Sequence, residues 1–263
     1  ADGAREALEA AFKAGAASAG RPALALGWAL ETLGETDRAR EVYANAAPGF
    51  VEAAQELARF DRGEPPALLV SNAREGAAEA LFSIATALGT ERGAGVALLY
   101  ARIALSLRPE LQEVRVLAGR LLDSQGQHEA AIEDFRMVPR GSAIFLTAEL
   151  SRADALLTLD RDDDAVIVLD ALAGAHPRDL EVQLTLAQAL SKAERWPEAI
   201  EAYDAAMALI DPVVRQHWSI FYRRGIAHER AGQWEQAEAD FKKALELEPD
   251  QPMVLNYLGY SWV

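Results

Sequence analysis

Pairs of small residues twelve positions apart recur along this chain, and through its middle they recur with a period of 34 residues. The pairs are Gly27/Ala39, Ala85/Ala97, Gly119/Ala131, Ala153/Ala165, Ala187/Ala199 and Gly225/Ala237. A large residue often follows the second member by four positions, as at Phe135, Tyr203 and Phe241. A fixed period of roughly 20–50 residues is the signature of repeat architectures. We therefore expect a row of similar, stacked units.

The spacing has a direct physical meaning if the units are helical hairpins. A small residue at each marked position lets the two helices of a hairpin approach closely, and the larger residue fills the space against the next unit. Hydrophobic residues make up 51% of the chain but aromatic residues only 7%, a balance that favours helices over strands. Gly34, Gly126 and Gly232 lie in the expected short turns, where a helix end favours a positive φ.

The unit resembles the tetratricopeptide repeat, which has small residues at its eighth and twentieth positions, an aromatic at the twenty-fourth and a proline near the thirty-second. Pro109, Pro177 and Pro249 occupy the closing position. The resemblance implies an all-α fold, a right-handed α-α superhelix (solenoid) of tetratricopeptide-type helical hairpins. The expected repeats span residues 20–53, 78–111, 112–145, 146–179, 180–213 and 218–251, and a truncated one begins at residue 252.

An irregular stretch before residue 78 divides the expected repeats into two blocks. Residues 1–77 form an N-terminal helical block with one clear repeat and an irregular junction. Residues 78–263 form a C-terminal block of five repeats plus a truncated sixth. Within the junction we expect an extra helix near residues 49–60 and a start of the next helix near Ser71 or Asn72.

A four-residue insertion and the two chain ends carry further expectations. Residues 214–217 should lengthen the following helix at its N-terminal end, and residues 1–18 should form a helix with Leu8 and Phe12 on its buried side. The final apolar stretch, PMVLNYLGYSWV, indicates a fragment of a larger bacterial repeat protein. Residues 221–263 are similar to bacterial repeat proteins that commonly carry an export signal, and four lysines against twenty-two arginines fit a GC-rich coding bias. We expect the bacterial periplasm or cell envelope rather than the cytoplasm.

The sequence offers no pattern for catalysis or for a bound metal or cofactor. It has no phosphate-binding glycine loop, HExxH or GxSxG motif. It also has no cysteine, which excludes disulfides and thiolate ligands. His217 and His228 stand about 16 Å apart along one helix, too far to share an ion, and His228 occupies a core position of the repeat. The acidic run LDRDDDAV (159–166) lacks the glycine of a calcium loop and is typical of a helix N-terminus. We expect no enzymatic activity, no metal and no cofactor.

Charge restricts the class of partner. The formal net charge is −15, which disfavours nucleic acid and anionic lipid and favours a basic protein or peptide. No apolar run reaches the roughly 18 residues that a membrane-spanning helix needs, so we expect no direct membrane insertion.

The resemblance also indicates where a partner would bind, because the first helix of each tetratricopeptide repeat lines the concave surface. The candidate residues at such positions are Phe82, Arg120, Gln188, Tyr222, Arg223, Arg230, Asn256 and Tyr260. The Lys/Asn/Arg clamp of family members that bind chaperone tails is absent, since apolar residues such as Val116 and Leu184 hold the fifth positions. Packing of Tyr222 and Tyr260 against neighbouring repeats is an equal alternative, because aromatic side chains serve both roles.

We interpret the chain as a non-enzymatic scaffold that binds a partner protein or peptide in the concave groove of a solenoid. One alternative is a structural module of the cell envelope that self-associates, for example as a homodimer through the C-terminal helix with Leu255, Leu258 and Trp262. Another is a regulatory arm of an enzyme whose catalytic domain lies outside this segment.

Overall fold

The computed structural model describes residues 20–65, 70, 72–89 and 93–261, and all regular secondary structure in these ranges is helical. The expected all-α class is confirmed. The expected helix over residues 1–18, with Leu8 and Phe12, lies outside the described residues. Residue contacts divide the chain into two compact units, and the division falls within one helix, between Ala118 and Gly119. Residues 138–145 belong with the first unit.

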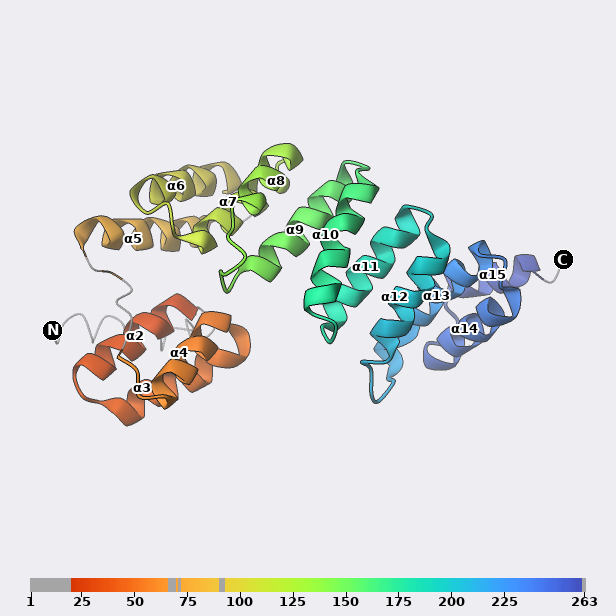
Figure 1. Ribbon diagram of the computed structural model, residues 1–263, viewed down its shortest axis with the longest axis horizontal. Coiled ribbons are helices and arrows are strands. Elements are labelled where there is room, and N and C mark those ends of the chain that lie inside the picture. The colour runs from red at the N-terminus through yellow and green to blue at the C-terminus, as the bar shows by residue number, and fades with distance from the viewer. Residues whose placement is uncertain (1–19, 66–69, 71, 90–92, 262–263) are drawn as a thin grey trace. The chain divides into compact units, whose positions relative to one another are not determined.

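The first unit contains two groups of helices (Figure 1). Their bounds are α2 Gly20–Thr32, α3 Thr36–Ala46, η2 Ala47–Gly49, α4 Val51–Asp61, α5 Ala73–Leu88, α6 Ala94–Leu107 and the beginning of α7 Gln112–Asp123. The α2–α3 hairpin closes around Tyr43, which is 1% exposed. A Cβ atom at Gly27 would lie 2.3 Å from the Tyr43 ring, so only glycine permits this approach.

The junction between the two groups agrees with the sequence-based expectation. An additional helix, α4, follows the first hairpin at Val51. Asn72 caps α5: its Oδ1 accepts from the backbone N–H of Glu75 at 3.0 Å, and its Nδ2 donates to the Glu75 carboxylate at 2.7 Å. Such a cap satisfies N–H groups that have no partner within the helix. Beyond the cap, α5 and α6 pack through Ala85, Ala101 and Ala104, all fully buried.

The second unit is a succession of helical hairpins (Figure 1). Its helices after α7 are α8 His128–Arg136, α9 Phe145–Thr158, α10 Asp162–Ala175, α11 Leu180–Lys192, α12 Trp196–Met207, η3 Arg215–His217, α13 Trp218–Arg230, α14 Trp234–Leu247 and α15 Pro252–Ser261. The close glycine–aromatic contact recurs, because a Cβ at Gly119 would lie 2.5 Å from Phe135 and one at Gly225 would lie 2.7 Å from Phe241.

The turns within hairpins use a positive φ whether or not they contain glycine. Gly34, Gly126 and Gly232 have φ of 78°, 74° and 75°, and Asp160 and Glu194 adopt 55° and 58° at turns of the same kind. At Glu194 the next N–H, of Arg195, donates to the carbonyl of Leu190 at 2.9 Å. Backbone hydrogen bonding therefore imposes the left-handed conformation even on residues that do not favour it.

The expectation for the insertion at residues 214–217 is corrected. Arg215–His217 form a 3-10 turn that leads into α13 at Trp218, and no α-helical turn is added. The turn is held by the imidazole of His217, whose Nδ1 accepts from the backbone N–H of Val214 at 3.0 Å. The imidazole thus satisfies a backbone N–H at the start of the helical segment, where no preceding helical carbonyl can accept it.

Candidate functional site

The expected binding residues fall into two sets, because Phe82 belongs to the first unit and the others to the second. Phe82 on α5 is half-buried and packs against the core formed by α5, α6 and α7. In the second unit, Arg120, Gln188, Arg223, Arg230 and Asn256 are exposed and Tyr222 is half-buried. Tyr260 lies within α15, but its side chain is outside the described part of the structure.

Tyr222 joins α13 to α15 through an aromatic cluster. Its ring centroid lies 5.8 Å from that of Tyr257 in an edge-on arrangement, 6.2 Å from Phe241 and 6.1 Å from Trp218. Burial raises the pKa of the Tyr222 hydroxyl, Tyr257 raises it further, and the charge of Arg223 opposes the shift. Tyr222 therefore packs against the next repeat while part of its ring stays accessible.

Exposed cationic and amide side chains also lie on α13 and α15. Arg230 is exposed and forms a surface ion pair with Glu229 at 3.4 Å, an interaction of little energetic weight. Arg223 interacts with the hydroxyl of Tyr203 on α12. Burial raises the pKa of that hydroxyl, and hydrogen bonds with Ser191 and Arg223 partly oppose the shift. Tyr222, Arg223, Arg230 and Asn256 are called the α13–α15 surface below.

Lys192 occupies a repeat position that faces the concave surface in the tetratricopeptide family. In the structure its side chain instead contacts the preceding hairpin. Its Nζ hydrogen-bonds the carbonyl of Leu157 at the end of α9 and pairs with Asp160 at 2.8 Å and Asp162 at 3.2 Å. The hydrogen bond with Asp160 raises the pKa of Lys192. The same hydrogen bond lowers the pKa of Asp160. The lysine of α11 thereby connects two successive hairpins.

The acidic run that contains Asp160 is explained by this contact and by the helix that follows it. Asp162, Asp163 and Asp164 form the first turn of α10, where the helix dipole favours negative charge. Within the described residues, no group of three or more His, Asp or Glu side chains has an arrangement that could hold a metal ion.

A polar network missed by the sequence analysis joins α12, α13 and α14. Arg224 on α13 forms a bidentate pair with Asp240 on α14, at 2.8 and 2.6 Å, and a further bond to Asp204 on α12 at 2.5 Å. Burial lowers the pKa of Arg224, but the two aspartates outweigh that effect and raise it. His228 is buried beside this network and its Nδ1 lies 2.7 Å from Oε1 of Gln233, as expected for a core imidazole.

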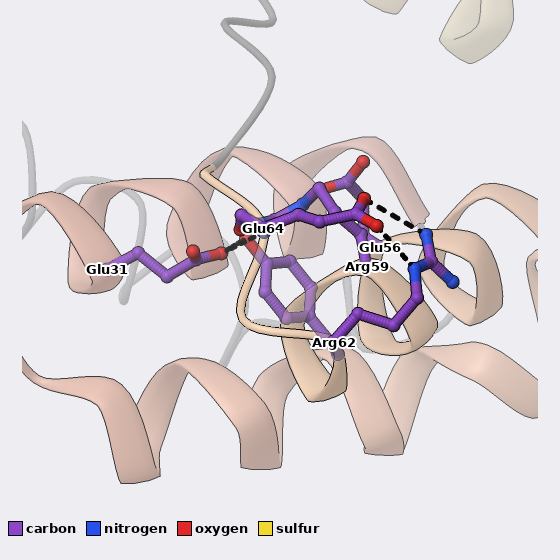
Figure 2. A network of polar contacts seen from close by, with 6 residues as sticks. Glu31, Glu56, Arg59, Arg62 and Glu64 are labelled. Carbon is purple, nitrogen blue, oxygen red and sulfur yellow. Dashed lines mark hydrogen bonds and ion pairs between the residues drawn. The ribbon is translucent and has the colours of Figure 1, made fainter.

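The first unit holds a second such network, centred on Arg59 of α4 (Figure 2). The buried guanidinium pairs with Glu31 of α2 and with Glu56 at 2.7 Å, and it donates to the backbone carbonyl of Glu64. The hydroxyl of Tyr43 also donates to Glu31, at 2.7 Å, and burial followed by this bond raises the pKa of Tyr43. These contacts connect α4 to the α2–α3 hairpin.

Models of the tetratricopeptide repeat family match residues 150–212 and 218–251. The chain contains tetratricopeptide repeats. This family is in general a protein–protein interaction scaffold and typically non-catalytic. None of the described helices of this repeat protein has the length and apolar character needed to cross a membrane.

Known proteins with the same repeat agree with this assignment. The TPR repeat-containing protein PA4667 of Pseudomonas aeruginosa is 31% identical over 145 residues, which cover 54% of this chain and 24% of that protein. The chain therefore spans about a quarter of that curated relative. Among solved structures, YrrB, described as a TPR protein with an unusual peptide-binding site, has a TM-score of 0.59 at 19% identity and covers 72% of this chain and all of YrrB. MamA 41-end from Desulfovibrio magneticus RS-1 has a TM-score of 0.59 at 22% identity, and the match covers 69% of this chain and 99% of that one. At these identities the likeness concerns the fold.

Proposed function

We propose that this tetratricopeptide repeat protein is a non-enzymatic scaffold that binds a partner protein or peptide on the α13–α15 surface. The observation that carries the proposal is the support beneath Tyr222, whose ring is held between Phe241 and Tyr257 and is still partly accessible. A side chain that is already fixed loses little conformational entropy when a partner binds. Tyr and Arg, which meet here, are the residue types most enriched among those that dominate binding energy.

The class of partner follows from the charge of the whole chain. With a net charge of −15, the protein attracts basic proteins and peptides over distances up to a Debye length, about 8 Å at physiological salt. The attraction of the acidic chain as a whole accelerates encounter. At the α13–α15 surface itself Arg223 and Arg230 are exposed, so the segment of the partner that binds there should present acidic or aromatic groups to them. Binding should accordingly be slower at high ionic strength.

The proposal is tested by co-purification of partners with the immobilised chain. We expect Tyr222→Ala/Arg230→Ala to lose a partner that the unchanged chain retains. Because Tyr222 also packs in the aromatic cluster, Arg230→Glu alone serves as a second variant that leaves the cluster intact. A matched control on the other helix of the same hairpin is Gln236→Ala/Lys242→Ala, whose two positions are exposed.

Far-UV circular dichroism must be unchanged for the binding comparison to count. Retention of every partner by both surface variants would place the binding site elsewhere. Loss of the same partner from the Gln236→Ala/Lys242→Ala control would also contradict the assignment, since those side chains lie on α14.

A further inference from the structure

The outward side of α6 in the first unit is apolar. Val96, Leu99 and Ile103 are 52%, 58% and 39% exposed, whereas Ala97, Ala101 and Ala104 on the same helix are fully buried. Spacings of three and four residues place Val96, Leu99 and Ile103 in one row along the helix. These three residues are called the α6 stripe.

The α6 stripe lies on a helix without acidic residues in an acidic protein. The helix AGVALLYARIALSL contains no Asp or Glu, and Arg102 is its one charged residue. At its C-terminal end Arg74 of α5 donates to the carbonyl of Ser106 at 3.1 Å, which adds a second cation. The contrast is α10, where Ile167 is 68% exposed but Asp163, Asp164 and Asp170 are exposed on the same helix.

Charge distinguishes among the partners that could cover such a stripe. A basic protein is drawn to surfaces that carry acids, such as that of α10. An anionic lipid surface calls for many cations along the polar side of an apolar helix, and α6 has one. A second copy of this chain also carries a net charge of −15 and is repelled wherever acidic surfaces meet. Two copies meet with least repulsion at a helix that has no acid, and among the described α-helices α6 and α15 are of this kind. The large apolar side chains exposed on α15 are Met253 and Leu255 among those described, whereas α6 carries the three of the stripe.

The stripe is also complementary to itself. Leu99 follows Val96 by three residues and Ile103 follows Val96 by seven. This is the spacing of the apolar residues where two helices pack side by side in a coiled coil. A two-fold axis beside Leu99 would set Val96 of one copy against Ile103 of the other, as a contact between identical surfaces requires. At Gly95, next to the stripe, a Cβ atom would meet nothing within 4 Å, so a partner helix can approach the backbone there.

We propose that two copies of this chain associate through the α6 stripe, with the two α6 helices antiparallel about a two-fold axis at Leu99. The proposal does not depend on the α13–α15 surface, because α6 belongs to the first unit. A stripe of three side chains is small beside the roughly 1,200–2,000 Å² of a stable interface, so the association should be weak. Salt should strengthen it, because screening reduces the repulsion between two acidic chains.

Sedimentation equilibrium of the full 263-residue chain tests the proposal. We expect a monomer–dimer equilibrium whose dimer fraction increases with salt, and at least a tenfold weaker association in Leu99→Glu. The matched control Ile167→Glu, which adds the same charge at an exposed apolar residue of α10, should associate like the unchanged chain. Leu255→Glu examines α15, where Leu255 is 47% exposed, and it too should leave the dimer intact.

Three outcomes would overturn the proposal. One is a chain that stays monomeric at every protein and salt concentration. Another is a dimer that Leu255→Glu dissociates and Leu99→Glu does not, which would make α15 the interface. The last is equal weakening by Leu99→Glu and Ile167→Glu, which would reflect added charge alone. Since Leu99 and Ile167 are both exposed, neither substitution removes a core contact.

Cross-linking locates the two-fold axis. The chain has no cysteine, so Leu99→Cys carries a single thiol. A copper–phenanthroline oxidant takes two electrons and two protons from a pair of thiols to form one disulfide. We expect Leu99→Cys to form a covalent dimer at least five times faster than Ile167→Cys under the same conditions. Equal rates for the two variants would contradict an axis at Leu99.

Discussion

The contact between a glycine and an aromatic ring is the smallest feature that governs each hairpin. Gly27, Gly119 and Gly225 leave room for Tyr43, Phe135 and Phe241, and in each case an added Cβ would lie under 3 Å from the ring. Interiors of proteins are packed so closely that one methyl group at such a place must displace its neighbours. The small residue of the repeat pattern is therefore a steric requirement.

Gly225→Ala should lower the free energy of unfolding by about 1–3 kcal/mol, since the ring of Phe241 has to move or the two helices have to separate. Gly174→Ala is the matched control: it also lies within a helix, α10, but a Cβ there meets nothing within 4 Å. That change should instead stabilise the protein by up to about 1 kcal/mol through helix propensity. Urea denaturation of both variants measures the difference, and equal effects would argue against the steric explanation.

At the scale of helices, charged side chains connect elements through contacts that the repeat pattern does not predict. Arg224 spans α12, α13 and α14, Lys192 connects α11 to the turn before α10, and Arg59 connects α4 to α2. The Arg224–Asp240 pair of the second unit is largely buried, with the two side chains 18% and 6% exposed. Removing one partner of a buried pair leaves the other charge unsatisfied, which costs more than the pair contributes.

Asp240→Ala should therefore destabilise the second unit by up to about 3 kcal/mol, because Arg224 loses its bidentate carboxylate partner. Arg224→Met/Asp240→Leu, which removes both charges and retains the volume, should recover most of the loss. Thermal unfolding followed by circular dichroism compares the two variants. A double variant no more stable than Asp240→Ala would indicate that the ion pair itself, and not the unpaired charge, determines the result.

On the scale of the whole molecule, the net charge of −15 opposes compactness. Acids outnumber Lys and Arg by 41 to 26, and the exposed ion pairs that offset part of this repulsion are individually weak. Self-repulsion of this kind acts between all repeats at once and depends on the ionic strength of the solution.

The melting temperature should therefore increase between about 0.01 M and 0.15 M NaCl, over which the Debye length falls from roughly 30 Å to roughly 8 Å. Differential scanning fluorimetry at constant pH and protein concentration measures it. A low protein concentration keeps the chain monomeric, so association does not contribute. A melting temperature that falls with salt would mean that attractive ion pairs outweigh the repulsion.

Much of this architecture was predictable because each repeat places the same kinds of residue at the same positions. Small residues twelve apart, followed by Phe135, Tyr203 or Phe241, indicated stacked helical hairpins, and the tetratricopeptide family and the all-α class were both confirmed. The binding residues were read from register alone, and they remain a proposal. Repeat positions alone could not show that Lys192 pairs with Asp160 in the turn before α10, or that Arg215–His217 form a 3-10 turn.

The sequence by itself determined the hairpin and its family, because close helix packing requires small residues at a fixed spacing that can be counted along the chain. Only the tertiary structure decided which charges meet, such as Arg224 with Asp240 and Arg59 with Glu31. It also decided that the row Val96, Leu99 and Ile103 stays uncovered. Such contacts depend on the rotation of each helix about its axis and on the length of the charged side chains. Neither produces a repeating pattern in the sequence.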